Sequence, residues 1–148
     1  MIDVRRIFKL LPHRYPFLLI DRVDDYVANE WLRGRKNVTY NEPWCEGHFP
    51  GKPVMPGVLL LESMAQATGL LAFLSMGEGA EEGSMYYLVG VDKARFKQPV
   101  VPGDTLIVEA RRLRELRGMY FFSAEARVDD RVVATAEVMT TRMVDDRE

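Results

Sequence analysis

The feature that most constrains the fold of this chain is the run from Val58 to Met76, whose apolar residues leave almost no polar face. A helix that is apolar nearly all round is buried rather than laid on a surface. Met55 precedes a proline, which disfavours helical backbone, so we expect the helix to begin at about Gly57. Such a helix is also long enough to cross a bilayer, at roughly 30 Å for about 20 residues. Polar residues cluster in its first half, however, and favour a soluble core helix over a membrane span: Glu62, Ser63, Gln66 and Thr68.

The rest of the chain reads mostly as strands joined by short turns. Two are expected before the helix, at Phe17–Val27 and Trp31–Tyr40, and four after it, at Tyr86–Val100, Thr105–Leu113, Met119–Val128 and Val132–Met143. The third of the later runs alternates, with Phe122, Ala124, Ala126 and Val128 on one face, which is typical of a half-buried strand. One long helix followed by consecutive strands indicates an antiparallel α+β domain. The length predicts a single domain, residues 1–148.

Two further segments carry predictions of their own. Met1–Leu11 reads as a short amphipathic helix that ends before a proline and docks through apolar side chains: Ile7, Phe8, Leu10 and Leu11. Gly77–Gly83 is rich in glycine and glutamate, and we expect a mobile surface loop there.

Composition excludes several classes of function. A net charge of −2 provides no global basic footprint for nucleic acid. Cys45 is the only cysteine, so no intrachain disulfide forms and a reducing compartment such as the cytoplasm is compatible. One cysteine and two histidines make a poor metal set, and we expect neither a metal ion nor a cofactor. The N-terminal residues lack the continuous apolar core of a signal peptide.

The segment before the helix is a stiff loop that carries His48. Prolines at 50, 53 and 56 fix their own φ and push the preceding residues toward extended backbone, which lowers the entropy lost when the loop is ordered. The first N–H groups of the helix have no internal partners, and Gly57 has no side chain to block a ligand oxygen there.

Glu62 lies in the helix, with Gln66 one turn later on the same face and near enough to bond it. A carboxyl buried in this way tends to be kept protonated by desolvation, and could give a proton while a neutral His48 takes one. The residues alone leave a second interpretation open, in which Glu62 is a satisfied core acid and His48 an ordinary loop histidine.

Three motifs resemble one known family. The run GHFPGKPVMPGVLLLESMAQ from Gly47 is similar to the signature of the (3R)-hydroxyacyl-[acyl-carrier-protein] dehydratases of bacterial-type fatty acid synthesis. The runs LPHRYPFLLIDRV from Leu11 and VDKARFKQPVVPGDTL from Val91 resemble two further blocks of that family, in its order and spacing. The resemblance implies a hot-dog fold, in which an antiparallel sheet wraps a long central helix. Glu62 matches the dehydratase-only branch, since the branch that also isomerises the double bond carries Asp there.

The resemblance also implies the roles of individual residues. His48 is expected to take the proton from C2 of the substrate, Glu62 to assist departure of the C3 oxygen, and the Gly57 N–H to stabilise the thioester oxygen. His48 and Glu62 are expected to come from different subunits of a homodimer, with three dimers forming a hexamer. We interpret His13, in the first block, as structural.

Substrate contacts are predicted more loosely. An apolar slot for the acyl chain is expected among Leu59, Leu60, Met64, Tyr86, Leu88 and Phe96, and Tyr86 resembles a gating position in some relatives. The acidic acyl carrier protein should dock on basic residues, either on Lys93, Arg95 and Lys97, which we expect to share one face of a strand, or on Arg111, Arg112, Arg114 and Arg117. Both groups are equally consistent with ordinary surface charge.

Three alternative functions remain. A hot-dog thioesterase shares the fold and a helix acid but does not need the proline-rich loop. A non-catalytic acyl-carrier binding subunit would not need His48 or Glu62. A hydratase acting on coenzyme A thioesters usually has a different Asp and His arrangement.

Overall fold

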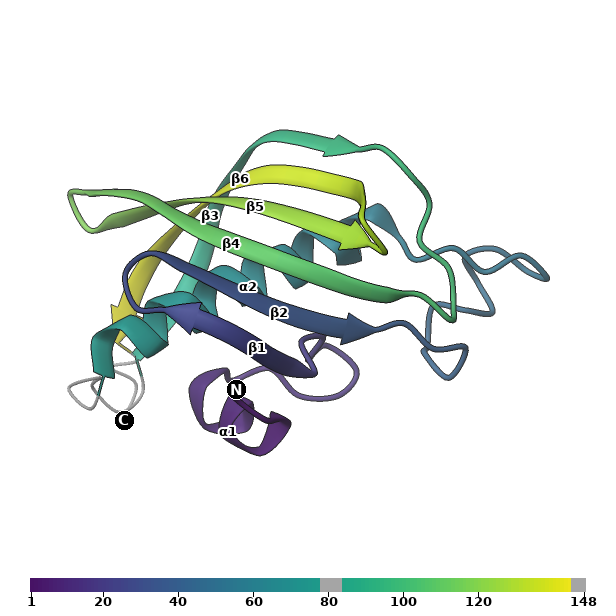
Figure 1. Ribbon diagram of the computed structural model, residues 1–148, viewed down its shortest axis with the longest axis horizontal. Helices are drawn as coiled ribbons and strands as arrows, with labels where there is room; N and C mark the ends of the chain where they lie inside the picture. Colours follow the sequence, from purple (N-terminus) through teal and green to yellow (C-terminus); the bar gives the residue numbers. More distant parts are fainter. Residues whose placement is uncertain (78–83, 145–148) are drawn as a thin grey trace.

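The long helix α2 (Gly57–Met76) lies along the concave side of a curved antiparallel sheet (Figure 1). The structure is a computed structural model and describes residues 1–77 and 84–144. The strands are β1 (Arg22–Val27), β2 (Trp31–Asn37), β3 (Ser84–Phe96), β4 (Thr105–Leu116), β5 (Met119–Val128) and β6 (Arg131–Val144). The other described helix, α1 (Val4–Leu10), packs against α2. This is the α+β hot-dog arrangement expected from the sequence.

The six strands lie in the order β1-β2-β4-β5-β6-β3. The hairpin β4–β5 turns at Arg117 and Gly118, and β5–β6 turns at Asp129, all with positive φ. β3 closes the sheet beside β6 after the chain has left α2. Short turns join the neighbouring strands β1–β2, β4–β5 and β5–β6, whereas β2 pairs with β4 and β6 with β3 across long stretches of chain.

The predicted helix α2 is confirmed at both ends. Pro56 precedes the first residue, and Gly77 follows the last with a φ of 63°, a conformation that L side chains rarely adopt. Although α2 passes the test of length and composition for a membrane span, 67% of its most apolar window is buried by the rest of the chain. Its surroundings are strands β2, β4, β5 and β6, so the predicted core helix is confirmed.

The ends of several strands and one contact of α1 differ from the prediction. Residues 17–21 were expected in β1, but Leu19 donates its N–H to the Gln66 side chain rather than to a strand. The predicted β2 and β3 both end earlier, at Asn37 and Phe96, since the chain then enters loops. In α1, Phe8 was expected to dock, but it is exposed and the Arg14 guanidinium covers its ring. The predicted loop Gly77–Gly83 lies outside the described residues except for Gly77.

The inner faces of the sheet and α2 form one apolar core. The alternation predicted for β5 is confirmed, because Phe122, Ala124, Ala126 and Val128 are buried. Their partners on α2 include Met64, Leu70 and Leu71, each at most 1% exposed. Fully burying each large aliphatic side chain stabilises the fold by about 1.5–3 kcal/mol, so this core holds α2 in one orientation.

The loop that carries His48 is tied at one end to the sheet and at the other to the segment between β3 and β4. Lys36 on β2 lies 2.7 Å from the Glu42 carboxylate, and both side chains are largely buried. Glu42 also accepts a hydrogen bond from the Thr39 N–H at 3.0 Å. At the other end, the Met55 N–H donates to the Val100 carbonyl at 2.8 Å. These contacts fix the loop relative to the start of α2.

Candidate active site

His48 is held by its own loop. Its Nδ1 lies 2.7 Å from the carbonyl oxygen of Val54, and the Val54 N–H donates back to the His48 carbonyl at 2.7 Å. A carbonyl oxygen can only accept, so Nδ1 must carry the proton of the neutral ring. Nε2 is then left with a free lone pair. The local structure therefore presents His48 as a base.

Gly57 begins α2 beside the same loop. No acceptor among the described residues bonds its N–H, as expected for the first turn of a helix. A Cβ placed on Gly57 would lie 3.2 Å from the ring of Phe96, which is tighter than ordinary van der Waals contact. His48, Gly57 and Phe96 all line one cavity of about 290 Å³. Three of the predicted site residues thus lie together.

Glu62 lies on α2 and lines a different cavity, of about 160 Å³. Its Oε1 accepts a hydrogen bond from Gln66 Nε2 at 3.0 Å, as the one-turn spacing predicted. The helix is buried, but the Glu62 side chain itself is 19% exposed because the cavity opens over it. The carboxyl is therefore accessible to a ligand.

His13, which the sequence analysis interpreted as structural, lies beside Glu62. Its Nε2 lies 3.4 Å from Glu62 Oε1 and its ring lines the same cavity. The one signal in the sequence was its place in the first motif, because nothing local links residue 13 to residue 62. The packing of residues 11–19 against α2 brings the two together.

Tyr86 on β3 also lines the Glu62 cavity. Its ring lies edge-on between Phe73 at 4.9 Å and Tyr120 at 5.5 Å, and its hydroxyl lies 3.0 Å from Met76 Sδ. Burial raises the pKa of the Tyr86 phenol, and the nearby Tyr120 adds to the effect. Tyr86 also borders a further cavity of about 170 Å³ beside Met76 and Phe122, so the ring forms a wall between two hollows.

Within one chain the predicted residues separate into two groups. His48, Gly57 and Phe96 line one cavity, whereas Glu62 and Tyr86 line another. The six residues expected along an apolar slot divide likewise. Leu60 belongs to the first group and Leu88 to the second, while Leu59 and Met64 line neither cavity. One copy of the chain therefore does not bring His48 and Glu62 into a common site.

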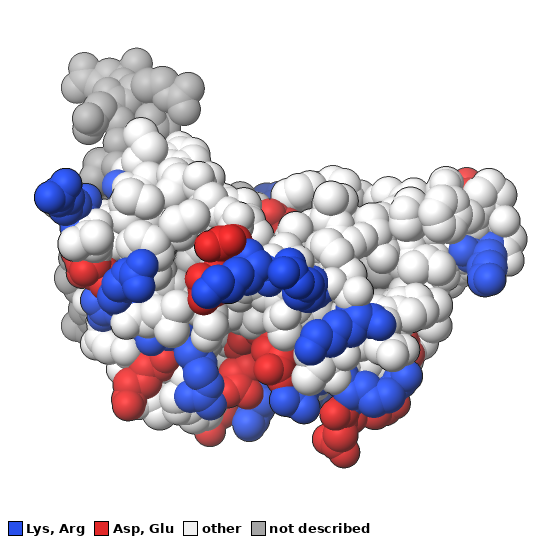
Figure 2. All heavy atoms as spheres, turned by 90° about the horizontal axis from the view of Figure 1, so that it is seen from above, with Lys and Arg blue, Asp and Glu red and all other residues white. Residues whose placement is uncertain are grey.

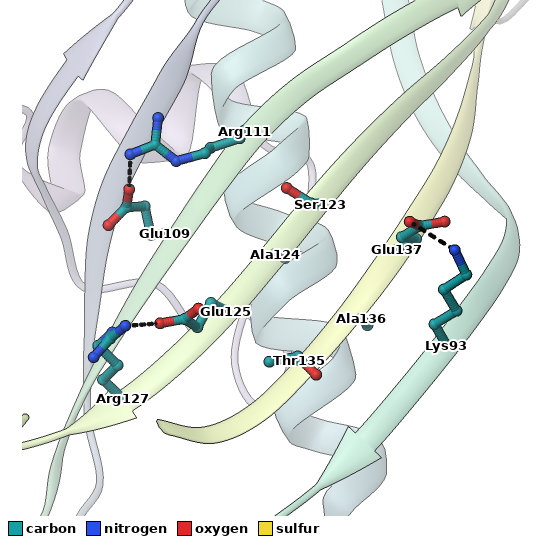
Figure 3. A pocket seen from close by; sticks show the side chains of 10 residues that line it. All are labelled: Lys93, Glu109, Arg111, Ser123, Ala124, Glu125, Arg127, Thr135, Ala136 and Glu137. Atoms are coloured by element: carbon teal, nitrogen blue, oxygen red, sulfur yellow. Dashed lines mark hydrogen bonds and ion pairs between the residues drawn. The ribbon is translucent and has the colours of Figure 1, made fainter. Parts of the chain in front are cut away.

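Three of the seven basic residues considered for docking pair with carboxylates among the described residues: Lys93 with Glu137, Arg111 with Glu109 and Arg112 with Glu115. Lys93 and Arg111 lie around a hollow of about 600 Å³ on the outer face of the sheet, which the Arg127–Glu125 pair also lines (Figure 3). Acidic and basic side chains are intermixed on the face shown in Figure 2. Lys97 lies past the end of β3, not on the strand as predicted, because the strand ends at Phe96. It lines the cavity of His48 instead.

Known proteins resemble this chain along most of its length. A family model described as a FabA-like domain matches residues 11–137. The 3-hydroxyacyl-[acyl-carrier-protein] dehydratase FabZ of Shewanella pealeana is 56% identical over 141 residues, which cover 95% of this chain and 92% of that protein. The FabZ of Yersinia enterocolitica is 54% identical over 141 residues, covering 95% of this chain and 83% of the relative.

Solved structures support the fold. A chain of the dehydratase heterocomplex ApeI:P from Xenorhabdus doucetiae superposes with a TM-score of 0.80 at 21% identity, covering 94% of this chain and 91% of that one. At this identity the likeness concerns the fold alone. Together with the family match and the close sequence relatives, it confirms the predicted fold and reaction class: the chain belongs to the FabA-like family, among its FabZ-type 3-hydroxyacyl-[acyl-carrier-protein] dehydratases.

Proposed function

We propose that this protein catalyses the reversible dehydration of (3R)-3-hydroxyacyl-[acyl-carrier-protein] to the trans-2-enoyl thioester and water during fatty acid elongation. The observation that carries the assignment is identity above 50% to FabZ dehydratases over 95% of the chain. The catalytic roles of His48, Glu62 and Gly57 and a site shared between two subunits are what the family resemblance implies, and the geometry of the described residues supports them.

His48 acts as the base. The bond from Nδ1 to the Val54 carbonyl leaves the Nε2 lone pair free to take the weakly acidic C2 proton. As that proton leaves, negative charge develops on the thioester oxygen. The Gly57 N–H lines the same cavity, has no acceptor among the described residues, and stands at the positive end of the α2 dipole. One such donor typically stabilises the transition state by about 3 kcal/mol.

Glu62 acts on the C3 oxygen. Hydroxide is a poor leaving group, so an acid must protonate the oxygen as the C3–O bond breaks. The Glu62 carboxyl opens into its cavity and is held by Gln66, which suits that role. A well-placed acid or base contributes roughly 10²–10⁴-fold to the rate.

A second copy of the chain completes the site. β3 is an edge of the sheet, and five large apolar side chains along it are exposed: Tyr87, Leu88, Val89, Val91 and Phe96. An apolar edge of 13 residues is suited to pairing with another strand. Antiparallel pairing of two β3 strands about Gly90 would place residues 86–88 of one copy beside residues 92–94 of the other.

This pairing would join the two cavities. Residues 86–88 border the Glu62 cavity, and the strand that ends at Phe96 borders the His48 cavity. The His48 and Gly57 of one subunit would then face the Glu62 of its partner, giving two sites per dimer. Three such dimers in a hexamer are the further assembly that the resemblance implies.

The substrate is carried by acyl carrier protein, which we place as the transient partner of the dimer in the cytoplasm. Its acidic surface requires a basic counterpart near the mouth of the site. Lys97 is the best-placed candidate because it lines the His48 cavity. The acyl chain would lie against the apolar walls formed by Tyr86, Leu88 and Phe96.

The proposal is tested by absorbance of the conjugated enoyl thioester. Crotonyl- and 3-hydroxybutyryl-carrier protein are supplied to the wild type, His48→Ala and Glu62→Gln. We expect the wild type to interconvert the two, and both folded variants to lose at least about 100-fold in kcat. A folded wild type that leaves both thioesters unchanged, or releases free thiol as a thioesterase would, overturns the assignment.

A further inference from the structure

Two side-chain nitrogen atoms lie near the same oxygen of the Glu62 carboxyl. Gln66 Nε2 lies 3.0 Å from Oε1, and His13 Nε2 lies 3.4 Å from that same atom. No side chain or backbone group among residues 1–77 and 84–144 bonds the other oxygen, Oε2. Both contacts are therefore made to one oxygen of a carboxyl that lines the cavity of about 160 Å³.

The Gln66 amide cannot rotate away from Oε1 of Glu62. Its Nε2 also donates to the Phe17 carbonyl at 2.6 Å, and its own Oε1 accepts the Leu19 N–H at 2.9 Å. The amide is therefore oriented by backbone on both sides, and its nitrogen must face Glu62. The side chain is only 2% exposed, so water does not compete for these bonds.

His13 is held as firmly by the residue after it. The Arg14 guanidinium donates to the carbonyl oxygens of Phe8 at 2.9 Å, Leu11 at 2.8 Å and His13 itself at 2.7 Å. These three bonds fasten the backbone of the turn after α1. The side chain of His13 is thereby directed toward α2, where Phe17 stacks against it with ring centroids 6.4 Å apart.

The protonation of His13 follows from its surroundings. Its Nδ1 is buried and has no hydrogen-bond partner among the described residues. An N–H buried without an acceptor is rare and costly, so a neutral ring carries its proton on Nε2. That nitrogen is the one that lies near Glu62 Oε1, at 3.4 Å. Oε1 therefore has Gln66 as its hydrogen-bond donor and the His13 ring as a second polar neighbour.

We propose that His13 is a positioning residue that, together with Gln66, fixes the orientation in which the Glu62 carboxyl meets the C3 oxygen of the substrate. This inference rests on the proposed dehydratase function. During dehydration the carboxyl O–H bond of Glu62 and the C3–O bond break, the C3 oxygen leaves as water, and His48 Nε2 retains the C2 proton. Return of one proton from His48 to Glu62 through solvent restores both groups.

Two amide variants separate this role from a merely structural one. In His13→Gln the amide nitrogen reaches the position of Nε2, whereas His13→Asn has the same functional group but is too short to reach Glu62. We expect His13→Asn to lower kcat roughly tenfold to hundredfold with KM changed less than about twofold, as for loss of one polar contact to an ionisable group. His13→Gln should recover most of the lost kcat.

The same substitution in a Glu62→Gln background completes the test. If His13 acts through Glu62, adding His13→Asn to Glu62→Gln should lower the residual kcat by less than about twofold. Three outcomes would each overturn the inference. The losses in kcat from the two substitutions multiply in the double variant, folded His13→Asn and His13→Gln have equal kcat, or KM rises at constant kcat. Thermal unfolding verifies folding, and His13→Leu replaces His13→Asn if the latter does not fold. Wild-type turnover is measured first, because its absence overturns the dehydratase assignment and not merely the role of His13.

Discussion

Gln66 Nε2 lies 3.0 Å from Glu62 Oε1 and 2.6 Å from the carbonyl oxygen of Phe17. One amide thus connects the helix acid to a segment that precedes β1. The contact within α2 was expected from the one-turn spacing, but the contact with residues 17 and 19 could come only from packing. Gln66 therefore links the motif that begins at Leu11 to the motif that contains Glu62, and both motifs contribute residues to the Glu62 cavity.

Replacing Gln66 with leucine should impair both stability and turnover. The Leu19 N–H and the Phe17 carbonyl would lose their partner, which typically costs about 1–3 kcal/mol for a buried polar group. Glu62 would lose a donor, so kcat should also fall. Ser63→Ala is the matched control, since Ser63 is buried on the same helix but donates to the Leu59 carbonyl. Denaturant unfolding and steady-state kinetics measure the two effects, and an unchanged kcat in folded Gln66→Leu would contradict this prediction.

Gly57→Ala should lower kcat/KM without preventing folding. The added Cβ would lie 3.2 Å from Phe96, so the ring must move within the His48 cavity. Because misplacement by even 1 Å can cost about 100-fold, we expect a loss of at least about tenfold. Adding Phe96→Leu should relieve the crowding and restore part of the activity. If the double variant is no better than Gly57→Ala, the loss does not arise from this contact.

Mixing two inactive variants should restore activity if the site is shared between subunits. When equal amounts of His48→Ala and Glu62→Gln exchange subunits, about half of the dimers are heterodimers. Each heterodimer has one intact site out of two, so about a quarter of wild-type activity is expected. The control mixes His48→Ala with the double variant, which provides no intact site. Subunit exchange is verified by mass spectrometry of the assemblies. Absence of recovery after proven exchange would show that each site is built within one chain.

Lys97→Ala should raise the KM for carrier-linked substrate severalfold and weaken its dependence on salt. Lys97 lines the His48 cavity, whereas Lys93 is paired with Glu137 at 3.5 Å and lies on the outer face. Opposite charges steer association, and added salt screens them over about 8–10 Å. Lys93→Ala is the control and should leave KM within about twofold. Equal effects of the two substitutions would argue against docking at Lys97.

Tyr86→Phe should make stability less sensitive to alkaline pH. Burial raises the pKa of the Tyr86 phenol, so the folded state holds this proton more tightly than the unfolded chain does. That contribution is fully present below the unfolded pKa of about 10 and is lost as the pH rises through the folded value. Above about pH 10, the melting temperature of the wild type should therefore fall more steeply with rising pH than that of Tyr86→Phe. Parallel curves for the two proteins would show that Tyr86 does not contribute.

Local chemistry by itself determined the elements of this fold. Pro56 and Gly77 bound α2 because a proline disfavours helix before it and a glycine adopts positive φ after it. β5 was predicted to the residue, since its alternation and the turns at Arg117–Gly118 and Asp129 act over only a few positions. The motifs around His48 and Glu62 likewise indicated the family from the sequence.

Only the tertiary structure decided which side chains meet. His13 contacts Glu62 because residues 11–19 fold back on α2, and no periodic pattern records a contact between such distant positions. His48 and Glu62 line different cavities because α2 extends away from the loop before it, while β3 forms the open edge between them. Sequence periodicity describes the neighbours of a residue along its own helix or strand, whereas contacts between elements depend on the register and curvature of the sheet that brings them together.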